Sequence, residues 1–121
     1  MTVAVLVALA AGVGAVLRHL ATVAVSRRWP GPFPAATLGV NVLGSLLAGV
    51  VLGAADSGTV DERTAAVATA GLLGGFTTLS TWAVDTVALA EHGAGRAATA
   101  NVVGTLTACV LAAALGLAVA S

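Results

Sequence analysis

Residues 71–82 read GLLGGFTTLSTW and lie in the middle of an otherwise apolar segment. Three glycines and four hydroxyl residues interrupt what would otherwise be a membrane helix. A backbone that leaves the helix at membrane depth places unpaired carbonyl and amide groups in hydrocarbon, which costs several kcal/mol for each group. Proteins accept such a break where the freed groups line a cavity or hold an ion. The stretch therefore predicts a broken membrane helix and an ion site.

The composition is that of a membrane protein. Apolar residues make up 59% of the chain and charged residues 8%, against about 25% charged residues in an ordinary soluble domain. The formal net charge is zero, so no basic surface points to nucleic acid as a partner. The single Cys109 excludes an internal disulfide and a zinc site of the paired-cysteine kind. We expect a multi-pass protein of the inner (plasma) membrane whose outer surface contacts lipid.

Four segments are long enough to cross a bilayer, which takes roughly 20 mostly apolar residues. They are predicted at 3–25, 35–55, 64–90 and 97–120. The short connections carry nearly all of the remaining charges and prolines. No positive charge precedes the first apolar run, so we expect a retained helix there rather than a signal peptide. The predicted fold is a single all-α domain over residues 1–121, with four transmembrane helices and the third of them broken.

Small and polar residues recur along two of these segments at four-residue spacing, which places them on one helix face. Small residues let membrane helices approach closely, and we expect Ser45, Gly49 and Gly53 to serve packing. Asn41 begins the same row, and a side-chain amide in mid-membrane is costly unless it has a partner. Its NH₂ group can donate to an anion, which makes Asn41 a candidate functional residue. The corresponding row in the fourth segment is Asn101, Thr105 and Cys109.

Arg18 lies inside the first segment, and an arginine there usually faces a bundle interior or an aqueous cavity. Two interpretations stay open. The side chain extends to the interface near Trp29, or it lines a water-filled vestibule and attracts anions. Asp85 and Glu91, near the end of the third segment, are expected to mark the exit from the membrane.

Four thin helices with few aromatic residues make a poor pore alone, so we expect a dimer with two copies of the broken segment. Its orientation is weakly specified, because cytoplasmic loops usually carry the arginine excess. Arg27, Arg28 and Arg96 are expected on one side, and Arg63 with both termini on the other. This small bias is compatible with insertion in both orientations or with a mild preference for outward-facing termini.

Three motifs occur in order along the chain: GVGAVLRH at 12–19, TLGVNVLGS at 37–45 and GGFTTLSTW at 74–82. With these motifs on four segments, the chain resembles the Fluc/CrcB-type fluoride channels along nearly its whole length. The resemblance implies passive fluoride export that protects the cell from fluoride. It also implies an antiparallel, dual-topology dimer with two fluoride pores along the subunit interface. A structural sodium ion (Na⁺) would lie at the dimer centre, bound by the backbone carbonyls of Gly74 and Thr77 from both subunits.

The resemblance also assigns residues to the fluoride pore. Asn41 would donate a hydrogen bond to fluoride, and Ser80 and Thr81 would supply hydroxyl donors. On the fourth helix, Thr105 and Asn101 fall where the family has polar pore-facing residues. Arg18 matches the family's arginine near the vestibule.

The chain departs from the family at the two aromatic pore positions. The family has phenylalanine at both, whereas this chain has Leu79 and Trp82. An aromatic edge is electropositive and can face an anion, and leucine has no such edge. Trp82 keeps an aromatic edge and adds an indole N–H donor. The chain is then either a homodimer with altered conductance, or half of a heterodimer whose paralogous subunit supplies the aromatic residues.

Two other classes are less compatible with the sequence. Small multidrug-resistance exporters, which are proton-coupled, depend on a carboxylate in their first helix, and residues 3–25 contain no acidic residue. A non-conducting membrane scaffold would explain the glycines but neither Asn41 nor the hydroxyl residues of 77–81. An enzyme is not expected, because the chain has no nucleophile–base pair, no cluster of metal ligands and no phosphate-binding loop.

Overall fold

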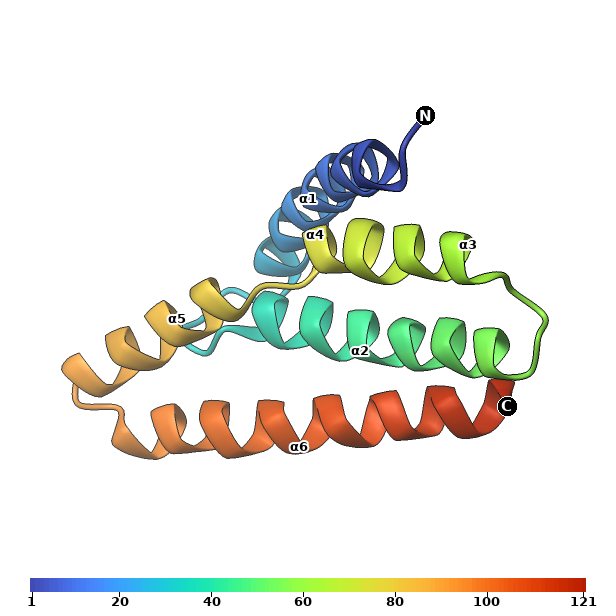
Figure 1. Ribbon diagram of the computed structural model, residues 1–121. Coiled ribbons are helices and arrows are strands. Elements are labelled where there is room, and N and C mark those ends of the chain that lie inside the picture. The colour runs from blue at the N-terminus through green and yellow to red at the C-terminus, as the bar shows by residue number, and fades with distance from the viewer.

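The computed structural model describes all 121 residues, and every regular element in it is a helix (Figure 1). Four segments are long and apolar enough to cross a membrane: Val3–Arg28, Ala35–Asp56, Glu62–Glu91 and Gly95–Ala120. The structure thus confirms an all-helical protein with four candidate spans. The first helix ends at Arg28, three residues later than position 25, and the other bounds agree with the expected ranges to within two residues.

The third segment differs from the other three because it consists of several pieces. The whole chain runs in the order α1 (Val3–Arg28), α2 (Ala35–Asp56), α3 (Glu62–Ala66), the π-helix η1 (Val67–Leu73), α4 (Gly74–Phe76), α5 (Leu79–Glu91) and α6 (Gly95–Ala120). A π-helical turn is wider than an α-turn and is frequent at functional sites.

Local sequence explains where the helices begin and end. Thr2 caps α1 by accepting a hydrogen bond from the Val5 N–H at 3.3 Å, and Asp61 caps α3 through the Thr64 N–H at 3.1 Å. Gly58, between α2 and α3, and Gly93, between α5 and α6, have φ values of +79° and +76°. That left-handed conformation suits glycine, so both residues allow the chain to reverse direction.

Helices α2 and α6 lie side by side along their length (Figure 1). Gly49 on α2 faces the carbonyl of Ala113, and Gly116 on α6 faces the carbonyl of Leu46. A Cβ atom at either glycine would collide with the opposing oxygen. Glycine is therefore required for this close approach, which confirms the packing role that the sequence predicts for Gly49.

Helix α1 packs on η1 and α4 by the same means (Figure 1). Gly14 on α1 faces the Leu72 carbonyl, and Gly75 on α4 faces the Ala11 carbonyl. A Cβ at either position would collide with the other backbone. This contact brings α1 against the place where the third segment changes conformation.

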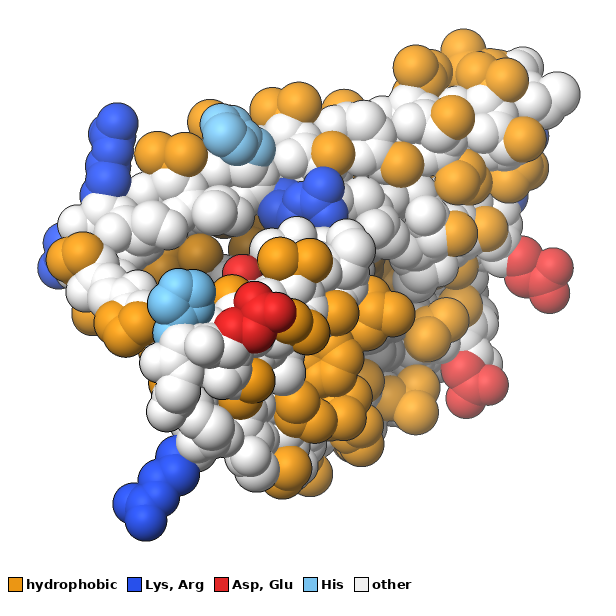
Figure 2. All heavy atoms as spheres, turned by 90° about the vertical axis from the view of Figure 1, so that its left-hand side faces the viewer, with side chains coloured by type: hydrophobic (Ala, Val, Ile, Leu, Met, Phe, Trp, Pro, Cys, Tyr) orange, Lys and Arg blue, Asp and Glu red, His pale blue; other side chains and the backbone are white.

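Most large apolar side chains point outward. Leu9, Val110 and Leu79 keep 59%, 66% and 73% of their surface exposed, and Figure 2 shows apolar side chains spread over much of the face that it draws. Such a surface suits lipid or another membrane-embedded chain rather than water.

Candidate functional site

The candidate site is built around two residues at which the third segment is not helical. Helix α4 ends at Phe76 and α5 begins at Leu79. Between them, Thr77 has φ −84° and ψ 162°, and Thr78 has φ −149° and ψ 117°. Both conformations are extended, so the nearby backbone groups lose helical hydrogen-bond partners. Those groups need other partners if they are not to be left unpaired.

Asn41 on α2 binds both backbone groups of Thr78. Its Oδ1 accepts a hydrogen bond from the Thr78 N–H at 2.8 Å, and its Nδ2 donates to the Thr78 carbonyl at 3.0 Å. One N–H of the amide remains for a further acceptor. In a continuous helix the Thr78 N–H would donate to the carbonyl of Gly74. The Gly74 carbonyl therefore lacks its usual helical donor.

Arg18 on α1 binds the other extended residue. Its Nη1 donates to the Thr77 carbonyl at 3.0 Å. The usual helical donor to that carbonyl would be the Thr81 N–H, which instead donates to the Thr78 hydroxyl at 3.2 Å. Both interpretations of Arg18 drawn from the sequence placed its side chain outside the packed helices, at the membrane interface or in a water-filled vestibule. The structure places its guanidinium on a backbone carbonyl inside the chain.

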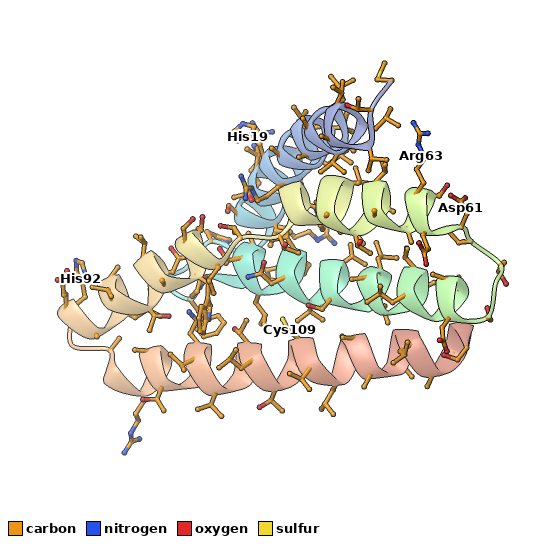
Figure 3. The ribbon with its side chains drawn as sticks, viewed as in Figure 1. His19, Asp61, Arg63, His92 and Cys109 are labelled. Atoms are coloured by element: carbon orange, nitrogen blue, oxygen red, sulfur yellow. The ribbon has the colours of Figure 1, made fainter.

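A hollow of about 230 Å³ opens beside the extended residues. It brings together four of the candidate pore residues, namely Asn41, Leu79, Trp82 and Thr105. No charged side chain lines it; the other lining residues are Ser45, Thr77, Thr78, Leu106 and Cys109. Figure 3 shows Cys109 in the space between α6 and α2. The sequence assigned Ser45 to packing and gave Cys109 no role in the pore, although each lies four residues after a candidate pore residue.

Ser80 and Thr81 do not line this hollow, and both are exposed. The Thr78 hydroxyl donates to the Thr81 hydroxyl at 3.0 Å and lies 3.4 Å from that of Ser80. Thr81 lines a second hollow of about 340 Å³, together with Asp85 and the connection between α1 and α2. The Thr78–Thr81 hydrogen bond thus links a residue that lines the first hollow to one that lines the second.

Asp85 was expected only to mark the exit from the membrane. The structure shows it half-buried, and its Oδ2 accepts a hydrogen bond from the Thr37 hydroxyl at 2.9 Å. Because Thr37 belongs to α2 and Asp85 to α5, this bond ties the two helices together at the second hollow. The sequence offered no signal for the pair, since 48 positions separate the two residues.

Trp82 has a fixed orientation. Its indole Nε1–H donates to the Asn101 carbonyl at 3.0 Å. The sequence suggested this N–H as a donor for an anion, but in the structure it has a backbone partner on α6. Trp82 therefore contributes its ring rather than its N–H to the hollow.

The two polar candidates on α6 occupy different environments. Asn101 is completely buried; its Nδ2 donates to the Thr86 hydroxyl at 2.9 Å, and its Oδ1 accepts from the Thr105 hydroxyl at 3.2 Å. Thr105 lines the hollow, whereas Asn101 does not. Asn101 thus joins α5 to α6 behind the hollow and supports the residues that line it.

Known proteins resemble this chain over most of its length. The family described as CrcB-like protein, Camphor Resistance (CrcB), matches residues 5–117. A protein of Frankia casuarinae named fluoride-specific ion channel FluC 1 is 43% identical over 95% of this chain and 93% of its own length. A protein of Natronomonas pharaonis named fluoride-specific ion channel FluC 2 is 47% identical over 95% of each. The fluoride-specific ion channel FluC of Shewanella baltica is 39% identical over 92% of this chain and 90% of its own.

Proposed function

The chain belongs to the CrcB-like family, and on that premise we propose that it is a fluoride-specific ion channel. It is a multi-pass protein of the cell membrane and conducts an ion rather than catalysing a reaction. In acidic surroundings, fluoride enters the cell as hydrogen fluoride. The acid ionises at the higher internal pH, and the anion is trapped. The channel then lets the anion leave passively, driven by the inside-negative potential, and so protects the cell.

The observation that best supports this function is the uncharged hollow beside the extended residues. Burying a bare anion costs on the order of tens of kcal/mol unless donors replace its water. The remaining N–H of Asn41 and the Ser45 hydroxyl are available as donors in the hollow. The Thr78–Thr81 hydroxyl pair continues the polar path to the second hollow. Neutral donors suit an ion that must bind and then leave, because a fixed charge would hold it.

The conducting unit that we propose is an antiparallel, dual-topology dimer. In support, the hollow opens to the surface of the single chain, and Leu79 at its edge keeps 73% of its surface exposed. A second subunit would close this wall, and the interruption at Thr77 and Thr78 would then lie at membrane depth along the interface. The partner is either a second copy or a paralogous subunit, since Leu79 provides no aromatic edge of its own.

We further propose that a sodium ion joins the two subunits at the interruption. The Gly74 carbonyl lacks its helical donor, and the Thr77 carbonyl has a second lone pair beside its bond to Arg18. Backbone oxygens of this kind suit a hard cation, which needs more ligands than the two that one subunit offers. Gly74 is exposed, and a Cβ there would meet only the Thr69 carbonyl, at 3.4 Å. These residues therefore fit half of a site that two subunits share.

Ion efflux from liposomes tests the proposed function. The purified chain alone is reconstituted in vesicles loaded with potassium fluoride or potassium chloride, and valinomycin provides the counter-current. We expect rapid fluoride efflux and chloride efflux no faster than from protein-free vesicles. Equal efflux of the two anions would contradict a fluoride-specific channel. Absence of efflux from folded protein would contradict a homodimeric channel, and restoration by a co-expressed paralogue would identify the heterodimer.

A further inference from the structure

Glycine packing places Arg18 at the interruption. Gly14 lets α1 approach the Leu72 carbonyl and the Phe76 N–H so closely that no side chain fits between them. Arg18 follows one helical turn later on the same face of α1. Its Nη1 therefore reaches the Thr77 carbonyl, at 3.0 Å, in a half-buried position. The position of the guanidinium is a consequence of the backbone contact.

The charge of Arg18 is not balanced by a carboxylate. Its hydrogen bond to the neutral Thr77 carbonyl is the only one that its side chain makes. The residue lies roughly 4 Å along the axis from the middle of α1, at 1.5 Å rise per residue. An arginine at this depth is costly and is usually kept for a function. Its charge therefore acts on whatever other ion approaches the same carbonyl.

We propose that Arg18 sets the sodium affinity of the interruption by competing electrostatically for the Thr77 carbonyl. The inference rests on the sodium site proposed above, because it concerns one of the two carbonyls of that site. The guanidinium occupies one lone pair of the oxygen, and sodium would take the other. Two cations that share one oxygen atom lie only a few ångströms apart. At that distance their repulsion exceeds the thermal energy several-fold, even at an effective dielectric constant of about 20.

A second effect of Arg18 would strengthen sodium binding rather than weaken it. Its hydrogen bond holds the Thr77 carbonyl in one direction, and a fixed carbonyl binds an ion better than a mobile one. The carbonyl is held independently, however, because the Thr78 N–H of the same peptide group donates to Asn41 Oδ1 at 2.8 Å. The charge repulsion therefore dominates, and Arg18 weakens sodium binding.

Sodium-dependent unfolding of the purified dimer tests this inference. Thermal unfolding is followed while sodium replaces N-methylglucamine at constant ionic strength, in wild type and in Arg18→Gln. We expect the sodium concentration for half-maximal stabilisation to fall about tenfold in Arg18→Gln. Arg18→Lys keeps the charge and should stay near wild type. Arg27→Gln removes the same charge at the exposed end of α1 and should leave the midpoint unchanged.

The outcomes separate this inference from the sodium site itself. If unfolding of wild type does not depend on sodium, the site is absent. If wild type responds to sodium but the midpoint of Arg18→Gln is unchanged or higher, the site stands and the role of Arg18 is overturned. Should Arg18→Gln not fold, wild type labelled with ¹⁵N-arginine provides the test. Sodium should shift the guanidinium signal that Arg18→Lys lacks, and an unshifted signal would overturn the inference.

Discussion

At the residue scale, the structure gives hydrogen-bond partners to the polar side chains that the sequence singled out. Asn41 binds both backbone groups of Thr78, Arg18 binds the Thr77 carbonyl, and Trp82 binds the Asn101 carbonyl. Each partner takes up a donor that the sequence alone left free for an anion. The hollow therefore contains fewer free donors than its polar residues alone suggest, and the side chains that carry them are held more firmly.

We predict that Asn41→Ala lowers both the stability of the protein and its fluoride flux, without preventing dimer assembly. The substitution leaves the N–H and the carbonyl of Thr78 without side-chain partners, at roughly 1–3 kcal/mol for each buried unsatisfied group. Thermal unfolding and liposome efflux measure the two effects. Ser45→Ala, in the same hollow, is the control and should retain wild-type stability. Full fluoride flux in Asn41→Ala would remove Asn41 from the path.

Asn101→Ala should destabilise the protein by about 2–4 kcal/mol, because it opens a cavity, removes the acceptor of the Thr105 hydroxyl and removes one of the two hydrogen bonds of the Thr86 hydroxyl. Thr107→Ala is a control on the exposed side of the same helix. Both variants are compared by denaturant or thermal unfolding in detergent. Equal stability of the two variants would contradict the assignment of Asn101 as the link between α5 and α6.

At the element scale, glycines decide how closely the helices approach, and neighbouring glycines have different roles. Gly75 packs against the Ala11 carbonyl of its own subunit, whereas a Cβ at Gly74 would make only an ordinary contact, 3.4 Å from the Thr69 carbonyl. The sequence GG at 74–75 does not reveal this difference. Only the rotation of α4 against α1 determines which of the two faces the rest of the subunit and which faces outward.

Gly75→Val and Gly74→Val should therefore fail in different ways. We expect Gly75→Val to prevent folding or to cost about 3 kcal/mol or more, because its side chain meets backbone that cannot move aside. Gly74→Val should leave the subunit folded while it abolishes sodium-dependent stabilisation and dimerisation. Unfolding and light scattering on the two purified variants decide between these results. A stable, sodium-responsive Gly74→Val dimer would contradict the proposed site.

The cap of α3 provides a pH-dependent prediction. The hydroxyl and backbone N–H of Thr64, bound to Asp61, hold the pKa of that carboxyl below its usual value of 3.8. The ionised form is thus favoured in the folded state, so its stabilisation is present above pH 3.8 and is lost as the pH falls through the lowered pKa. The difference in stability between wild type and Asp61→Ala should be constant above that range and shrink below it. If the difference in stability grew as the pH fell, it would contradict a lowered pKa of Asp61 in the folded protein.

The sequence predicts features that depend on neighbouring residues better than contacts between residues far apart in the chain. The four spans could be predicted, because about 20 apolar residues in a row suffice to cross a bilayer. The extended pair follows from the local richness of residues 71–82 in glycine and hydroxyl residues. The partners could not be predicted, since 37 positions separate Asn41 from Thr78 and 59 separate Arg18 from Thr77. Those contacts depend on helix packing through Gly14 on α1 and Gly44 on α2, which face η1, α4 and Thr77 and which no local pattern encodes.

At the scale of the whole molecule, most charges gather at the two ends, and Arg18 is the exception that lies near the middle of a span. Figure 3 shows Asp61 and Arg63 at one end and His92 at the other, and both termini lie at the end with Asp61 (Figure 1). The arginines at the helix ends distribute unevenly, with Arg63 at one end of the molecule and three at the other, namely Arg27 and Arg28 in the last turn of α1 and Arg96 in the first turn of α6. So small a bias specifies orientation weakly.

Insertion in both orientations can be measured by labelling. In a Cys109→Ala background, Gly31→Cys and Thr59→Cys place single cysteines in exposed connections at opposite ends. If the chain inserts both ways, a membrane-impermeant thiol reagent should label about half of either variant in intact cells. Complete labelling of one variant and none of the other would show a fixed orientation, and a homodimer would then have to be parallel.

The most direct test of the proposed path uses Cys109, the only cysteine of the chain, which lines the hollow with Asn41 and Trp82. Fluoride efflux is measured from liposomes before and after N-ethylmaleimide, with the extent of labelling determined by mass spectrometry and Cys109→Ala as the control. If fluoride passes through the hollow, labelling should stop efflux from wild type and leave Cys109→Ala unchanged. Undiminished fluoride efflux from fully labelled protein would contradict the account.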